Sequence, residues 1–168
     1  GFFDKLFGND DPGVTRRPEF AGVQYPSEAG ELGGAVRRHL EAAEVEEGAE
    51  RGVRGIVAPF GDYDYAGPVM GTAYAHVRAI ASSVERVIVC ASSRRVPFRG
   101  LAVAGFGALG TPVGDIRVDL DAVQEAVDRE LARPVEAAFE PAAGLELQLP
   151  FVREVFEVAK VLPVLVGD

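Results

Sequence analysis

The sequence is poor in the residues that build disulfides and soft-metal sites. It contains one cysteine, Cys90, and two histidines, His39 and His76, among 168 residues. A single cysteine can form neither an intrachain disulfide nor a multi-cysteine metal cluster, and this fits a reducing compartment, so we expect a cytoplasmic protein. The sequence also lacks both an uninterrupted apolar run of about 18 residues and a basic start followed by a long apolar stretch, which disfavours a membrane-spanning helix and a cleavable export signal.

Charge and composition limit the partners that the chain can take. The formal net charge is −9, and 48% of the residues are hydrophobic. This apolar content can supply the core of one α/β domain, whereas an acidic body repels the phosphates of nucleic acids and anionic membranes. We therefore expect no nucleic acid and a basic, neutral or apolar partner. Features of the opening peptide, the last strand and the motifs lead us further to expect a protein partner or self-association and no cofactor.

The first residues predict a short amphipathic helix followed by a linker. Its apolar side would consist of Phe2, Phe3, Leu6 and Phe7. This peptide could cover an apolar patch of its own domain, dock into a partner's groove, or attach shallowly to a membrane, of which the last is not favoured. Because proline and glycine follow, we assign residues 1–19 to the peptide and linker and 20–168 to the folded domain.

Helices and strands alternate in the first half of the domain. Ser27 is a candidate cap for a helix with Leu32, Val36, Leu40 and Ala43 on its apolar side. A strand at 53–59, a helix at 68–82 with Val69, Ala73, Val77 and Ile80 inward, and a strand at 85–92 follow. This alternation predicts an α/β fold with a largely parallel or mixed sheet sandwiched by helices.

The second half adds extended segments, two helices and a last strand. Residues 101–119 read as two extended segments joined by glycine-rich turns. Asp121 and Gln124 resemble a capping box for a helix at 122–131 with Val123, Val127 and Leu131 in the core. A helix at 145–159 and a strand at 160–167 end the sequence, which predicts a sheet that is incomplete at its C-terminus, with its last strand covered by another copy or subunit.

Oxygen-bearing side chains crowd the end of the first strand, in the stretch IVAPFGDYDYAGP. Asp62 and Asp64 could form a carboxylate pair for acid/base chemistry or a hard-metal seat, but capping the following helix is the favoured interpretation. Tyr63 and Tyr65 could line a pocket or pack in the core.

A second polar turn follows the strand at 85–92. Ser93 and Arg94 lie where open α/β sheets bind ligands, and Arg94 could clamp a phosphate or carboxylate. The favoured alternative is an ion pair of Arg94 with Asp62 or Glu146. We expect Cys90 to be buried on its strand and neither histidine to be a ligand.

Three stretches, FAGVQYPSEAGEL, IVAPFGDYDYAGPV and LELQLPFVREVF, resemble the Memo family, component B of the AmmeMemoRadiSam set. The resemblance covers about residues 17–168 and implies a fold related to class III extradiol dioxygenases. It also implies histidines at three positions, where this chain has Phe60, Arg94 and Ala143. Neither Phe nor Ala offers a metal lone pair, and Arg repels a cation, so we expect no metal site.

These patterns predict a degenerate, C-terminally truncated Memo-like domain without catalysis, which acts as a binding or structural subunit on a protein partner or another copy. The alternative is a metal-independent or magnesium-dependent enzyme for a small phosphorylated or carboxylated substrate. Its site would use Asp62, Asp64, Arg94 and Glu146. The candidate pocket is lined by these four residues with Tyr63, Tyr65 and Ser93.

Overall fold

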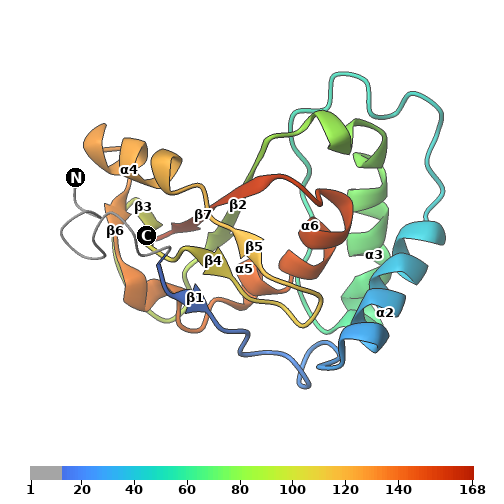
Figure 1. Cartoon of the computed structure of the whole chain (residues 1–168), viewed down its shortest axis with the longest axis horizontal. Coiled ribbons are helices and arrows are strands. Elements are labelled where there is room, and N and C mark those ends of the chain that lie inside the picture. Colours follow the sequence, from blue (N-terminus) through green and yellow to red (C-terminus); the bar gives the residue numbers. More distant parts are fainter. Residues whose placement is uncertain (1–12) are drawn as a thin grey trace.

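The structure, a computed structural model, describes residues 13–168 (Figure 1). The expectations for the apolar peptide with Phe2, Phe3, Leu6 and Phe7 lie outside the described residues. Residues 13–168 contain two small sheets and five α-helices, with two 3₁₀ helices at Arg78–Ser83 and Glu136–Phe139. No helix of this part of the chain is both long and apolar enough to cross a bilayer.

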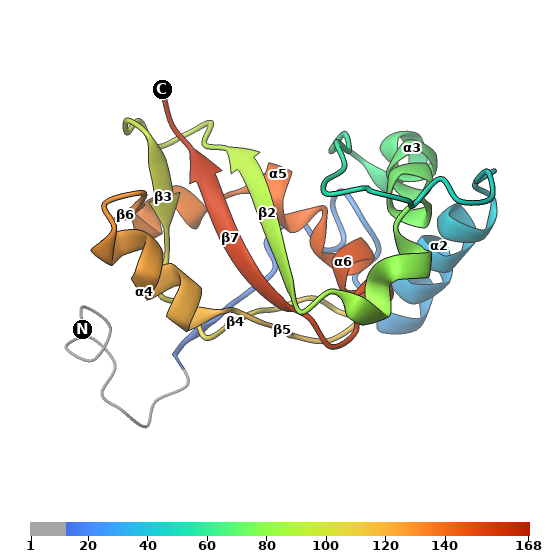
Figure 2. The same ribbon diagram turned by 90° about the horizontal axis from the view of Figure 1, so that it is seen from above.

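The larger sheet is mixed, as the sequence predicts. Its order is β2 (Arg86–Ser92), β7 (Lys160–Val166), β3 (Leu101–Val103) and β6 (Arg133–Pro134). β2 and β7 are parallel along their whole length, whereas β3 runs antiparallel to β7 and parallel to β6. Figure 2 shows β2 at the edge of this sheet, with α4 (Leu120–Asp128) beyond the opposite end.

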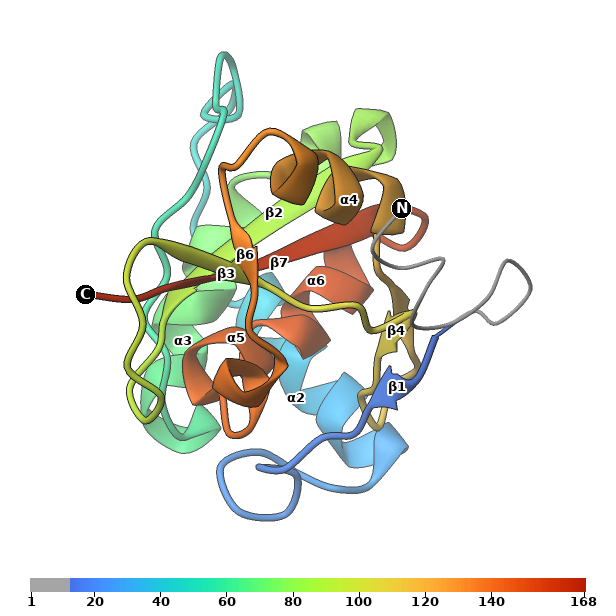
Figure 3. The same cartoon turned by 90° about the vertical axis from the view of Figure 1, so that its left-hand side faces the viewer.

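The smaller sheet connects the start of the domain to the glycine-rich region. β4 (Ala108–Leu109) and β5 (Ile116–Arg117) form an antiparallel pair, which confirms the extended segments joined by turns. β1 (Thr15–Arg16) adds to β4 in parallel. Figure 3 shows β1 beside β4. Residues 15 and 16, which the sequence placed in the linker, thus take part in the fold.

Three helices pack into a group beyond the free edge of β2. They are α2 (Ala29–Glu41), α3 (Tyr63–Ala75) and α6 (Leu149–Val155). The predicted inner side of α2 is confirmed, because Leu32, Val36 and Leu40 are buried. Ser27 does not cap it, since the helix begins after Glu28 without a side-chain cap.

Two glycines allow α2 and α3 to approach closely. A Cβ atom on Gly71 would lie 2.5 Å from the backbone carbon of His39, and one on Gly67 would lie 2.4 Å from Nε2 of the same residue. Contacts under 3.0 Å do not occur for real Cβ atoms. The glycine spacing of four residues therefore forms a notch on α3 that receives the half-buried His39.

Several predicted boundaries and faces are wrong. α3 begins at Tyr63 and not at 68, so its buried side consists of Tyr63, Gly67, Met70, Gly71, Tyr74 and Ala75, and Val69 is 57% exposed. Asp119 caps α4 in place of Asp121, accepting from the backbone N–H of Ala122 at 3.2 Å. This helix ends at Asp128, which leaves Leu131 exposed.

The strand predicted at 53–59 is absent, and the helix predicted at 145–159 is divided. Residues 53–59 run without secondary structure, and Val57 is 97% exposed. The pattern that favours a strand has no pairing partner here, because the segment stays apart from β2. The second helix splits into α5 (Ala143–Glu146) and α6 at residues 147 and 148.

Candidate functional site

The turn before α3 is a helix cap. Oδ1 of Asp62 accepts a hydrogen bond from the backbone N–H of Asp64 at 2.9 Å, and the residue is the N-cap of α3. Asp64 lies exposed in the first turn, where a negative charge interacts favourably with the helix dipole. The capping interpretation of Asp62 is confirmed, and this carboxylate is committed to the backbone.

The two tyrosines of this turn lie in opposite environments. Tyr63 is buried, and its hydroxyl donates to the backbone oxygen of Leu147 at 2.7 Å. Burial, with smaller effects of the neighbouring Tyr25, Tyr74 and Glu146, raises the pKa of Tyr63 far above its usual range, so its hydroxyl stays protonated and donates. Tyr65 is 86% exposed and faces away from the core.

A glutamine links α3 to the end of the segment 53–59. Gln148 accepts a hydrogen bond from the Tyr74 hydroxyl at 3.0 Å and donates to the backbone oxygen of Pro59 at 2.9 Å. Burial raises the pKa of Tyr74 above its usual range, which keeps this donor protonated. Sequence reasoning missed both residues, because an amide in a helical stretch carries no distinct signal.

Glu146 is enclosed by the start of the domain. It is fully buried, and its oxygens accept from Arg16 Nη1 at 2.8 Å, from the Tyr25 hydroxyl at 2.8 Å, and from the backbone N–H groups of Glu19 and Phe20 at 2.9 and 2.8 Å. Burial, then the hydrogen bond to Glu146, raises the pKa of Tyr25 above its usual range. We call these five residues the carboxylate hub.

The hub replaces the ion pair that the sequence favoured. Arg16 is 4% exposed and forms the ion pair with Glu146, which Arg94 was expected to form. Within the described residues Arg94 takes part in no ion pair, so its predicted pairing with Asp62 or Glu146 is wrong. Arg16 was missed because the sequence assigned it to a linker, about 130 positions from its partner in the chain.

Two of the positions that the resemblance assigns to histidine lie close together, and the third adjoins a residue beside one of them. The guanidinium carbon of Arg94 lies 6.0 Å from the ring centroid of Phe60. A Cβ atom on Gly144, the neighbour of Ala143, would lie 3.2 Å from Cβ of Ala91 and 3.5 Å from the Phe60 ring. We call Phe60, Ala91, Arg94, Ala143 and Gly144 the aromatic–arginine cluster. It lies at the C-terminal end of β2.

This cluster does not fit a metal ion. A phenyl ring and a methyl group have no lone pair to donate, and a permanently charged guanidinium opposes a cation. Residues 13–168 contain no group of three or more His, Cys, Asp and Glu side chains placed to hold a metal. The donors that the resemblance leads one to expect are therefore replaced by a cation–π contact.

Ser93 and Cys90 also differ from ligand-binding residues. The Ser93 hydroxyl donates to the backbone oxygen of Val96 at 2.8 Å, which closes the turn after β2. Cys90 is exposed, so the expectation of a buried thiol is wrong. Exposure alternates along β2, with Val89 buried and Ile88 exposed, and Cys90 lies on the exposed face of the strand.

A cleft of about 810 Å³ follows the free edge of β2. One wall consists of β2 from Arg86 to Ser92, and the other consists of residues 53–58 and Phe60. Tyr74, Gln148 and Phe156 also line it. This apolar cleft was not foreseen, because the sequence predicted that 53–59 would fill the space as a strand.

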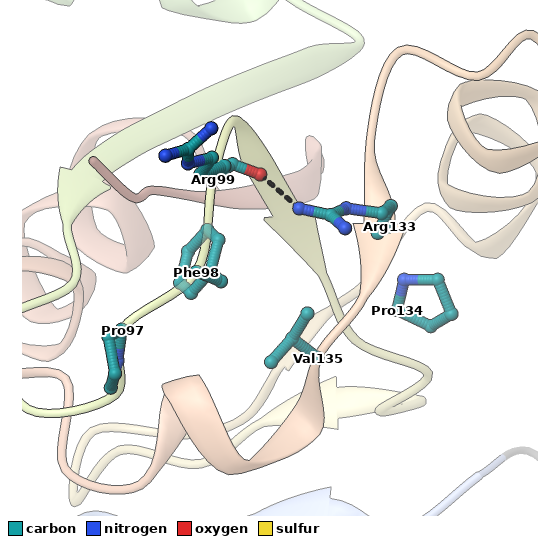
Figure 4. Close-up of a pocket in the computed structure, with 6 residues that line it drawn as sticks. All are labelled: Pro97, Phe98, Arg99, Arg133, Pro134 and Val135. Atoms are coloured by element: carbon teal, nitrogen blue, oxygen red, sulfur yellow. Dashed lines mark hydrogen bonds between the residues drawn. The ribbon is translucent and has the colours of Figure 1, made fainter.

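A smaller hollow of about 590 Å³ lies at the opposite edge of the sheet (Figure 4). It is lined by Pro97, Phe98, Arg99, Arg133, Pro134 and Val135. The Arg133 guanidinium donates to the backbone oxygen of Arg99, which joins the loop before β3 to β6. Asp62, Asp64, Arg94 and Glu146 line neither this hollow nor the cleft.

Comparison with known proteins agrees with the fold. The sequence model of the family described as Memo-like protein matches residues 16–168. A MEMO1 family protein of Saccharomyces cerevisiae is 27% identical over 88% of this chain and 48% of its own length. The memo-1 homolog of Caenorhabditis elegans is 30% identical over 92% of this chain and 43% of its own length.

Protein MEMO1 of Rattus norvegicus gives a similar result, with 26% identity over 92% of this chain and 52% of its own length. The chain thus spans about half the length of the curated relatives that it matches. Because the family match extends over nearly all described residues, and the mixed α/β architecture agrees with it, this chain belongs to the Memo-like protein family.

Proposed function

We propose that this Memo-like chain is a non-catalytic binding subunit, which docks onto a protein partner or another copy of itself and does not use a histidine-held metal. The family's activity as a whole is not carried over, because the chain matches only about half of its relatives' length.

The observation that carries the proposal is the aromatic–arginine cluster. Phe60 and Arg94, at two positions where the resemblance expects imidazoles, lie close together, and Ala143 at the third position adjoins Gly144 beside Phe60, while none of the three side chains is a metal donor. Phe60 and Arg94 fill this place with a ring and a fixed positive charge. Such a pair stabilises local packing and offers no coordination for iron or copper.

The geometry gives the enzymatic alternative less support. It requires Asp62, Asp64, Arg94 and Glu146 to face one substrate. Glu146 is fully buried and bonded within the carboxylate hub, and Asp62 caps α3. A carboxylate that is enclosed in this way cannot exchange protons with a substrate without local opening.

Docking is supported by apolar side chains that remain uncovered beside the cleft. Val57 is 97% exposed and Ile88 on β2 is 59% exposed. Exposed apolar groups at an unpaired sheet edge favour association, because burying them removes apolar surface from water. The acidic net charge favours a neutral, basic or apolar partner over a polyanion.

The metal part of the proposal is tested by elemental analysis with a gain-of-function control. The native chain should contain no stoichiometric iron, copper or zinc. The triple variant Phe60→His, Arg94→His, Ala143→His should bind Zn²⁺ or Co²⁺, because Phe60 lies close to Arg94 and to Gly144, the neighbour of Ala143. Stoichiometric iron or copper in the native chain would refute the proposal, and failure of the triple variant would refute the proximity of these positions.

The docking part is tested by the mass of the purified protein in solution. Light scattering after size exclusion should show self-association that weakens in the variant Ile88→Glu, while Glu154→Gln, at an exposed site on α6, should behave as the native chain. A monomer over a wide concentration range that also binds no apolar dye would contradict this part.

A further inference from the structure

The hollow beside β6 combines apolar side chains with positive charge (Figure 4). Phe98 and Val135, both half-buried, line it together with Arg99 and Arg133, which are both exposed. Within residues 13–168 neither of these arginines forms an ion pair. We call this hollow of about 590 Å³ the arginine hollow. Its lining suits an acidic segment that also carries an apolar residue.

Positive charge is concentrated around this hollow although the chain as a whole is acidic. The segment 93–100, SRRVPFRG, contains three arginines and neither Asp nor Glu, and Arg133 on β6 adds a fourth. The whole chain has 26 acidic and 17 basic residues. A local positive field on an acidic body attracts a negatively charged segment and repels the same surface of a second copy.

The complementary chemistry lies on the loop after α2. Glu44, Glu46 and Glu47 flank Val45 there, and all four residues are exposed, Val45 to 39%. We call residues 44–47 the acidic loop. In the part of the chain that the structure describes, its three glutamates take part in no ion pair. The loop therefore offers an apolar side chain and unpaired carboxylates side by side.

The acidic loop and the arginine hollow lie at opposite ends of the molecule. Figure 1 and Figure 2 both show α2 and the chain that follows it at one end, and β6 with β3 at the other. One copy therefore cannot bring its own loop to its own hollow, whereas two copies can. Such a contact joins two different surfaces of identical chains, so each pair keeps one loop and one hollow open, and association continues to a ring or an open chain.

We propose that the acidic loop of one copy docks into the arginine hollow of the next. Val45 contacts Phe98 and Val135, and this contact removes apolar surface from water. The glutamates beside it face Arg99 and Arg133, and these charges fix the orientation of the two copies. The inference rests on the proposed function where that function invokes another copy, and it assigns the contact to a surface other than the edge of β2.

Two charge-reversal variants test this contact from both sides. Arg99→Glu changes the hollow but keeps the hydrogen bond from Arg133, which reaches the backbone oxygen of residue 99. The double variant Glu44→Arg, Glu46→Arg changes the loop at exposed sites. In light scattering each variant alone should associate at least about tenfold more weakly than the native chain. An equimolar mixture of the two should regain association, because the loop of the first and the hollow of the second are both native.

The matched control is Arg117→Glu, which reverses an exposed charge on β5 outside the hollow and should associate as the native chain does. High salt should dissociate the native assembly, because it screens exposed charges. Equal melting temperatures of the native chain and the variants verify that the variants are folded.

Association that is unchanged in Arg99→Glu, or in the loop variant, would overturn the proposal. If Ile88→Glu weakens association while both charge-reversal variants associate as the native chain does, the proposed function stands and this surface does not take part. A native chain that stays monomeric would also overturn the proposal, and would leave the arginine hollow to an acidic segment of a different protein.

Discussion

Replacing Glu146 by Gln is expected to destabilise the fold more than any other single exchange of one polar group for another that we consider. The side chain is fully buried, and the substitution keeps its shape while removing its charge. The Nε2 group of the new amide must then face a donor, because all four partners of Glu146 donate to it. At the same time the guanidinium of Arg16, 4% exposed, loses the buried carboxylate at 2.8 Å and keeps only the carboxylate of Glu19 at 3.6 Å.

The expected magnitude follows from these two effects. Removing one partner of a buried ion pair costs about 3–5 kcal/mol, and a buried donor left unsatisfied costs about 1–3 kcal/mol. Since the amide oxygen still accepts from some donors, we expect a loss of about 3–5 kcal/mol in the free energy of unfolding. Domains have free energies of unfolding of about 5–15 kcal/mol, so the variant should still fold at low temperature but with little stability left.

Urea unfolding followed by circular dichroism measures this loss. The matched control is Glu154→Gln, which removes a carboxylate from the exposed pair with Arg37 at 3.4 Å and should change the free energy of unfolding by less than about 1 kcal/mol. Arg16→Met combined with Glu146→Gln should cost less than the sum of both single variants, because the pair is coupled. Equal, small losses in Glu146→Gln and Glu154→Gln would refute the role of the hub.

The notch on α3 yields two further predictions. Gly71→Ala should lower the free energy of unfolding by about 1–3 kcal/mol, since its Cβ would lie 2.5 Å from the backbone of His39. The control Gly30→Ala, with nothing within 4 Å of its Cβ, should be neutral or slightly stabilising. Similar melting temperatures of the two variants in thermal unfolding would contradict the close approach of α2 and α3. Burial, and then Arg38, lower the pKa of His39 below 6.5, although Asp64 opposes this. The neutral ring therefore contributes stability above pH 6.5 that is lost as the pH falls through the lowered pKa, so the native melting temperature should drop on acidification more than that of His39→Gln.

Local residue patterns predicted those helices and strands that depend on neighbouring residues or on a repeated spacing of apolar side chains. The run of β-branched residues at 86–92 and the apolar spacing of Leu32, Val36 and Leu40 both correspond to observed elements. These signals depend on side-chain periodicity, which the sequence displays directly. The resemblance to the Memo family added the order of the elements, and the family match over residues 16–168 agrees with it.

Long-range polar contacts could not be predicted in the same way. Nothing local to Glu146 indicates that its partners are Arg16 and Tyr25, because any of many arginines could fill this role. The expectation for Arg94 failed for this reason: a vacated metal position suggested an acidic partner, and the aromatic ring of Phe60 was available instead. The prediction of a strand at 53–59 failed for a different reason. The residue pattern of this segment favours a strand, but strand pairing also depends on where the edge of β2 lies.

The carboxylate hub also has a consequence for the order of events during synthesis. Arg16 is made before Glu146, and the carboxylate that pairs with it follows 130 residues later. At a synthesis rate of about 5–20 residues per second, the segment around β1 lacks the ion pair with Glu146 for several seconds or more. Nascent chains halted before residue 146 should therefore leave the segment around β1 open to proteases, and chains released after synthesis should protect it.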